Sequence, residues 1–122
     1  MNFKELKIWE RSYQLTFVGY KILCEVSFEE KFGITSQLKK ALASIPSNIA
    51  EGASRSSDKG FMRFLHIAFG SAFEAETQFM LLKDLHLIKT DISSILIEIN
   101  EVQKMIASFI RNLKSKNQIV KA

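Results

Sequence analysis

Apolar residues recur at alternating steps of three and four over residues 92–113, and this pattern constrains the fold more than any other in the chain. The residues are Ile92, Ile95, Ile99, Val102, Ile106, Phe109 and Leu113. Because an α-helix turns once in about 3.6 residues, this spacing places all of them on one side of a helix. A seam sustained for this length favours packing at about 20° to neighbouring helices. The pattern therefore predicts a long helix in a bundle.

Similar periodicity marks three earlier segments, and only short polar connections separate them. The predicted helices span about residues 5–27, 34–54, 59–85 and 92–113. Candidate N-cap residues are Ser57 or Asp58 for the third helix and Thr90 or Asp91 for the fourth. Four long helices with short connections predict a single all-α domain, an antiparallel up-down-up-down four-helix bundle. Residues 114–122 are polar, and we expect them to be frayed.

The only proline, Pro46, lies inside the second predicted helix, with helical apolar spacing on both sides of it. Proline lacks the amide that would bond to the carbonyl of Leu42, at a cost of roughly 3 kcal/mol. Ser44, Ser47 and Asn48 can supply side-chain hydrogen bonds where the backbone ladder is interrupted. Since no loop-length polar run separates the two halves, we predict one helix that is kinked at Pro46.

The first predicted helix carries two apolar stripes on nearly opposite sides. One stripe contains Leu6, Trp9, Tyr13, Phe17, Tyr20 and Cys24, and the other Ile8, Leu15, Val18, Ile22 and Val26. A helix that covers a single core needs only one stripe. We therefore predict that the second stripe faces another copy of the protein. Its expected partner is the flank of the third helix formed by Met62, Phe69, Phe73 and Met80.

Composition excludes several classes of protein. A content of 47% hydrophobic residues argues against disorder, and the single cysteine, Cys24, excludes an internal disulfide and fits a reducing cytoplasm. No apolar run approaches the ~18–20 residues of a membrane-spanning helix, and no apolar leader follows Met1. We expect a cytoplasmic protein that does not enter the membrane.

Positive charge gathers at one end of the predicted bundle, where the chain start, the second connection and the end of the fourth helix meet. We call this the basic end. Its cations are Lys4, Lys7, Arg11, Arg55, Lys59, Arg63, Arg111, Lys114, Lys116 and Lys121, against the acids Glu5, Glu10, Glu51 and Asp58. Ten minus four gives +6 there, which exceeds the +4 of the whole chain. We predict phosphate contacts through the first eight of these cations, without sequence preference. Solvated lysines at loop ends are the alternative.

No catalytic constellation is apparent. His66, His86 and Cys24 lack the spacing of a metal or nucleophile site, and the glycines are isolated. We therefore expect no enzymatic activity, cofactor or metal. The aromatic residues at helical spacing are expected in the core and interfaces rather than as a base-stacking platform. Glu74 and Glu76 are either polar contacts for Lys39, Lys40 or Arg63, or ordinary exposed acids.

Several stretches resemble the four helix bundle protein family, whose genes lie in intervening sequences of bacterial 23S ribosomal RNA genes. They are Phe3–Trp9, Leu38–Ala41, Ser44–Gly52 (Ser-Ile-Pro-Ser-Asn-Ile-Ala-Glu-Gly), Phe64–Ser71 and Glu74–Gln78. The resemblance implies an antiparallel bundle that assembles as a homopentameric barrel. It also implies similarity to the accessory proteins of diversity-generating retroelements, which bind nucleic acid and partner a reverse transcriptase.

These observations predict a non-enzymatic, oligomeric helical bundle that binds RNA or DNA through its basic end. The alternative is a protein-interaction adaptor, for example an accessory subunit of a reverse transcriptase. A third possibility is a monomeric or dimeric bundle whose basic end is merely solvated.

Overall fold

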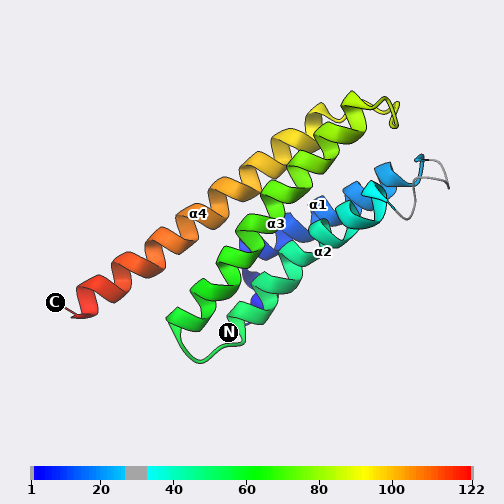
Figure 1. The fold of residues 1–122 in the computed structure, drawn as a ribbon. Coiled ribbons are helices and arrows are strands. Elements are labelled where there is room, and N and C mark those ends of the chain that lie inside the picture. The colour runs from blue at the N-terminus through cyan, green and yellow to red at the C-terminus, as the bar shows by residue number, and fades with distance from the viewer. Residues whose placement is uncertain (1, 27–32, 122) are drawn as a thin grey trace.

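The computed structural model describes residues 2–26 and 33–121, with side chains described as far as residue 116. One turn of 3-10 helix precedes the α-helices of these residues (Figure 1). The 3-10 turn, η1, spans Phe3–Glu5, and the helices are α1 (Lys7–Leu23), α2 (Ile34–Ala53), α3 (Asp58–Asp84) and α4 (Ser93–Lys121). The described residues contain no strand, so the predicted all-α fold is confirmed.

Successive helices run in opposite directions, as Figure 1 shows, and α1 and α3 each pack against both α2 and α4. This is the predicted up-down-up-down arrangement. The start of the chain, the α2–α3 connection and the end of α4 therefore lie at one end of the bundle. The α3–α4 connection lies at the opposite end (Figure 1).

The helix bounds differ from the prediction at both ends of α1 and at the end of α4: α1 ends at Leu23, before the predicted end at residue 27, which lies outside the described residues. Residues 3–5 form η1 because the side chain of Asn2 accepts a hydrogen bond from the Lys4 amide, and Leu6 is extended before α1 begins. Helix α4 continues to Lys121, past the predicted end at residue 113, while the fraying of residues 114–122 stays a prediction. No glycine or proline stops it there, and each added residue of a helix gains one backbone hydrogen bond.

Helix α2 passes through Pro46 without ending, which confirms one helix rather than two. The carbonyl of Leu42, which Pro46 leaves without its usual amide donor, lies 2.8 Å from the hydroxyl oxygen of Thr16 in α1. The Asn48 amide donates to both the carbonyl and the hydroxyl oxygen of Ser44, each at 2.8 Å. Side chains thus satisfy the polar groups around the interrupted turn. The kink itself stays a prediction.

The core lies along the centre of the bundle, where each helix contributes one inward stripe. Fully buried side chains come from α2 (Leu38, Leu42, Ile45 and Ile49), α3 (Leu65, Ala68, Ala72, Phe79 and Leu82) and α4 (Ile99, Val102 and Ile106). Each fully buried large apolar side chain contributes roughly 1.5–3 kcal/mol. The close fit is clearest at Gly52, where a Cβ atom would lie 2.8 Å from Cδ1 of Phe61.

One of the two predicted helix caps, that of α3, is confirmed. The hydroxyl of Ser57 accepts a hydrogen bond from the Gly60 amide at 3.1 Å, so Ser57 rather than Asp58 is the N-cap of α3. At the start of α4 the carbonyl of Ile92 accepts the first helical hydrogen bond, so neither predicted residue holds the N-cap position itself, and Asp91 just before it accepts from the Ser93 amide at 2.9 Å. Thr90 instead donates its amide and hydroxyl to Glu25.

The Thr16 contact with Leu42 gives a test of how the interrupted turn is stabilised. Thr16→Val keeps the side-chain shape but removes the donor, which leaves a buried carbonyl unsatisfied. We expect the free energy of unfolding to fall by about 1–3 kcal/mol in urea titrations followed by circular dichroism. Thr77→Val is the matched control, because the Thr77 hydroxyl donates to the Phe73 carbonyl on an exposed surface where water can replace it. Equal losses in the two variants would contradict this account.

Two helical glycines are expected to respond oppositely to alanine. Gly52→Ala forces a methyl group against Phe61, and overpacking of this kind costs about 1–3 kcal/mol. Gly70 is exposed and nothing lies within 4 Å of a Cβ atom built there, so Gly70→Ala should gain about 1 kcal/mol of helix propensity. Thermal unfolding should show a lower midpoint for the first variant and a higher one for the second. A stabilised Gly52→Ala protein would show that α2 and the start of α3 pack less closely.

Candidate nucleic-acid interface and association surfaces

The basic end brings together cations from five parts of the chain. Those predicted to contact phosphate are all exposed: Lys4 in η1, Lys7 and Arg11 in α1, Arg55 after α2, Lys59 and Arg63 in α3, and Arg111 and Lys114 in α4. An ion pair of 3.7 Å between Lys116 of α4 and Asp58 of α3 shows that these two helix ends meet. The rings of Phe61 and Phe109 lie 5.3 Å apart between the same helices.

Some of these cations are engaged within the protein. Arg11 binds both carboxylate oxygens of Glu98 in α4, at 2.6 and 3.0 Å, and this hydrogen-bonded pair raises the pKa of Arg11. Arg55 pairs with Glu51 one helical turn earlier and lies over the ring of Phe64. Arg11 and Arg55 are thus held by structural contacts that the sequence did not reveal.

Six of the predicted cations have no carboxylate within 4 Å among the side chains described. They are Lys4, Lys7, Lys59, Arg63, Arg111 and Lys114. Because no acidic side chain offsets their charge, exposed and unpaired cations can attract an external anion. Several of them at one end of the bundle raise the local positive potential. We call these six residues the open cations.

The two stripes of α1 are present, but our assignment of their directions is wrong. Ile8 and Leu15, predicted to face another copy, are 4% and 1% exposed in the subunit's own core. Ile22 and Val26 pack beside them, and of that stripe only Val18 is largely exposed. The buried Ser12 and Gly19 lie on the Ile8 side of the helix, and such small residues permit close helix packing. They are the sequence signal that could have identified the inward side.

The outward side of α1 is therefore the aromatic one. Tyr13, Phe17 and Tyr20 are 50%, 53% and 39% exposed, and Trp9 stacks on Tyr13 with ring centroids 5.0 Å apart. We call these four residues the α1 aromatic face. Tyr13, Phe17 and Tyr20 border a hollow of about 430 Å³, and Lys21 lies over the ring of Phe17. Three large exposed rings in a row form a surface of the kind that mediates association.

The predicted flank of α3 is exposed in its central and later parts. We call Met62, Phe69, Phe73 and Met80 the α3 flank. Phe73 and Met80 are 45% and 48% exposed, whereas Met62 and Phe69 are half-buried. The rings of Phe69 and Phe73 pack edge to face with centroids 4.9 Å apart. This flank is a second apolar surface.

These two apolar surfaces lie on opposite sides of the bundle. The hydroxyl of Tyr20 donates to the carbonyl of Lys39, which places the α1 aromatic face on the side of α1 nearer α2. Glu76, at helical spacing from Phe73 and Met80, accepts from Gln103 of α4 at 2.9 Å. The α3 flank therefore lies on the α4 side. Neither Glu74 nor Glu76 forms a salt bridge with Lys39, Lys40 or Arg63 among the side chains described.

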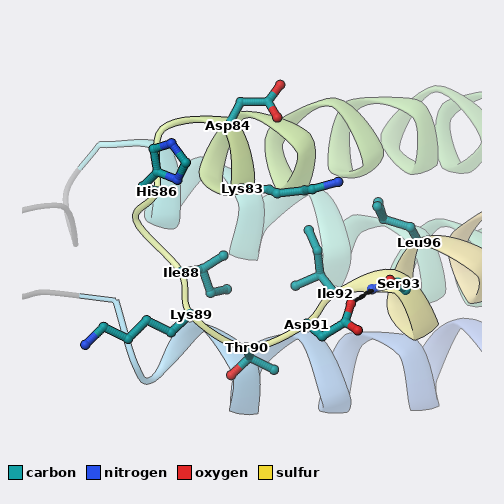
Figure 2. A pocket seen from close by; sticks show the side chains of 10 residues that line it. All are labelled: Lys83, Asp84, His86, Ile88, Lys89, Thr90, Asp91, Ile92, Ser93 and Leu96. Atoms are coloured by element: carbon teal, nitrogen blue, oxygen red, sulfur yellow. Dashed lines mark hydrogen bonds between the residues drawn. The ribbon is translucent and has the colours of Figure 1, made fainter.

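The opposite end of the bundle contains a hollow of about 560 Å³ beside the α3–α4 connection, shown in Figure 2. Lys83 extends across it toward α4, and Asp91 is turned to the start of α4 (Figure 2). Glu25 of the α1 end accepts from the amides of Lys89 and Thr90, at 3.2 and 3.0 Å, and from the Thr90 hydroxyl. These hydrogen bonds, those of Thr90 foremost, lower the pKa of Glu25. The contacts fasten the connection to α1.

No candidate chemistry emerges from the remaining polar residues that the structure describes. His66, His86 and Cys24 are exposed on different elements, and no group of three or more His, Cys, Asp or Glu residues could hold a metal there. His86 takes a left-handed backbone conformation, φ 58°, which ends α3. None of the helices described has the length and apolar character needed to span a bilayer.

This chain is similar to one described protein family and to a protein of known structure. The model of the family described as 23S rRNA-intervening sequence protein matches residues 4–108. A crystal structure of a protein with unknown function, from the S23 ribosomal protein family of Bacteroides thetaiotaomicron, shares 25% identity and a TM-score of 0.78. That match covers 84% of this chain and 97% of the other. No curated protein matches. The chain therefore belongs to the 23S rRNA-intervening sequence protein family.

Proposed function

We propose that this protein is a non-enzymatic, oligomeric bundle that binds RNA or DNA through its basic end, without preference for sequence. The observation that carries the proposal is the group of six open cations at that end. Cations that meet phosphates release condensed counterions, which gives salt-dependent affinity for any nucleic acid. Since phosphate contacts carry no sequence information, such a surface does not select a sequence. The resemblance to accessory proteins of retroelements supports the same function.

We further propose that copies associate through the α1 aromatic face of one subunit and the α3 flank of the next. Because these surfaces differ and lie on opposite sides of the bundle, the association is head-to-tail, and it closes into a ring if the rotation allows. The resemblance implies five copies. A ring about an axis along the bundles would bring all basic ends to one side, which multiplies the positive potential.

An adaptor that binds another protein is the second candidate. The observation that favours it is the same α1 aromatic face, which can accept a helix of a different protein, such as a reverse transcriptase, in place of the α3 flank. A monomer in solution would favour this candidate over the ring.

Charge reversal tests the nucleic-acid interface. The triple variant Lys59→Glu, Arg63→Glu and Lys114→Glu should weaken binding to generic RNA and DNA by at least tenfold at low salt, because three open cations become acids. Fluorescence polarisation across a salt series should also give a shallower salt dependence. The logarithmic slope should fall by about 0.7–0.9 for each phosphate that the variant no longer neutralises.

The matched control reverses three exposed cations away from the basic end and from the association surfaces, Lys40, Lys83 and Lys89. It changes the net charge equally and should affect binding much less. Wild-type protein that binds neither RNA nor DNA at low salt would refute the proposal. Equal losses of affinity in the two triple variants would show that net charge, and not the basic end, is responsible.

Light scattering tests the association surfaces. Phe17→Glu and, separately, Phe73→Glu should each reduce the molar mass in solution, because a buried carboxylate at the contact costs several kcal/mol. Val18→Glu is the control, since Val18 is 46% exposed beside Phe17 but points toward the α4 side of α1. A mass reduced by Val18→Glu and not by Phe17→Glu would overturn the assignment.

A further inference from the structure

A groove between α1 and α4 lies beside the basic end, away from the two association surfaces. It measures about 400 Å³, within the range of small-molecule sites. Its apolar floor is formed by Ile8 of α1 and by Met105 and Phe109 of α4. Lys7 stands on the α1 side and Lys104 on the α4 side, so the groove has a cation from each helix.

The floor of this groove is held in place by the core. Ile8 is 4% exposed, and the half-buried Phe109 packs its ring against Phe61 with centroids 5.3 Å apart. The remaining surface of Phe109 and Met105 borders the groove. A fixed aromatic and thioether surface suits the flat, apolar face of a planar ring.

The polar groups around the floor are available to a ligand. Lys7 is an open cation, whereas the Lys104 ammonium pairs with Glu101 at 3.8 Å; because the Lys104 side chain is 76% exposed, this weak surface pair can give way to a phosphate. Ser108 and Asn112 add a hydroxyl and an amide to the α4 side. An apolar floor between two ammonium groups matches a nucleobase flanked by phosphates.

Further along the same two helices, a bidentate pair of Arg11 and Glu98 joins α1 to α4. Beyond that pair the same helices border a second hollow of about 280 Å³, which includes Val18 and Ser94 but no lysine. Of these two hollows between α1 and α4, only the groove next to the basic end has lysines in its lining. The open cations continue the positive surface there.

We propose, building on the nucleic-acid binding above, that this groove seats one unstacked base of a single strand, with its neighbouring phosphates at Lys7 and Lys104. Bases in a duplex are paired and stacked, so they do not reach a floor between two helices, whereas those of a single strand turn outward freely. The protein thus selects single-stranded over double-stranded nucleic acid while remaining indifferent to sequence.

Filling the groove tests this proposal. Fluorescence polarisation would compare a labelled uridine-rich single strand of about 16 nucleotides, the upper end of known site sizes, with a duplex of equal length. The wild type should bind the single strand about tenfold more tightly, the effect of one stacked base. Ser108→Trp should abolish that preference and leave duplex affinity unchanged. Ser94→Trp, two heptads earlier and in the hollow without lysines, is the matched control and should change neither affinity.

The outcomes separate this proposal from the one on which it rests. Duplex binding without any preference for the single strand overturns the groove alone. A preference that survives Ser108→Trp, or that Ser94→Trp removes equally, also overturns it. If neither form of nucleic acid binds, the proposed function fails and the groove assignment fails with it. Circular dichroism establishes that both tryptophan variants remain helical.

Photocrosslinking gives an independent measurement of where the base lies. A single strand that contains 5-iodouracil would be irradiated with the wild-type protein, and the adduct located by mass spectrometry after trypsin digestion. We expect it on the peptide Met105–Arg111, which carries the α4 part of the floor. An adduct on Ser12–Lys21, which carries most of the α1 aromatic face, would overturn the groove as the base site.

Discussion

The contact between Thr16 and the carbonyl of Leu42 ties α1 to α2 at the turn that Pro46 interrupts, and the same hydroxyl lies 2.8 Å from the Ser12 carbonyl of its own helix. Pro46 removes the amide donor of a buried carbonyl, and an unsatisfied buried carbonyl is costly. The hydroxyl of Thr16 reaches it at 2.8 Å, and Gly19 keeps α1 close to α2, since a Cβ atom there would lie 2.5 Å from Leu42. In the rotation that α1 takes about its own axis, the aliphatic stripe with Ile8 and Leu15 lies in the core, and the aromatic stripe with Tyr13 and Phe17 faces outward.

Much of the fold follows from local rules. The four helices, the Ser57 cap and the uninterrupted α2 are readable from periodicity and residue type, because those signals act within a few residues. The direction of α1 is not readable from hydrophobicity, since both stripes are apolar. The direction of α1 is accompanied by two features that hydrophobicity does not report. The small residues Ser12 and Gly19 lie on its inward side, and Thr16 contacts the turn of α2 that Pro46 interrupts. Likewise, the helix ends that form the basic end follow from topology alone, whereas the engagement of Arg11 by Glu98, 87 positions away, does not.

The charged and apolar surfaces lie on different parts of the bundle. The open cations lie at one end of the helices, while the α1 aromatic face and the α3 flank lie along opposite sides. The proposed association along the sides would therefore leave the end uncovered. In this way a single helical bundle can use its sides for contacts between subunits and one end for contacts with a ligand, without a second domain.

The anchoring of the α3–α4 connection by Glu25 has a consequence for motion. Together with the Arg11–Glu98 pair it ties α1 to the α4 side of the bundle at the far end and at the middle of their contact. No comparable bond joins the two helices between Lys7 and Asn112 among the side chains described. Among the side chains described, the ties between α1 and the α4 side thus lie away from the cations, so local opening of these two helices is expected first at the end that carries them.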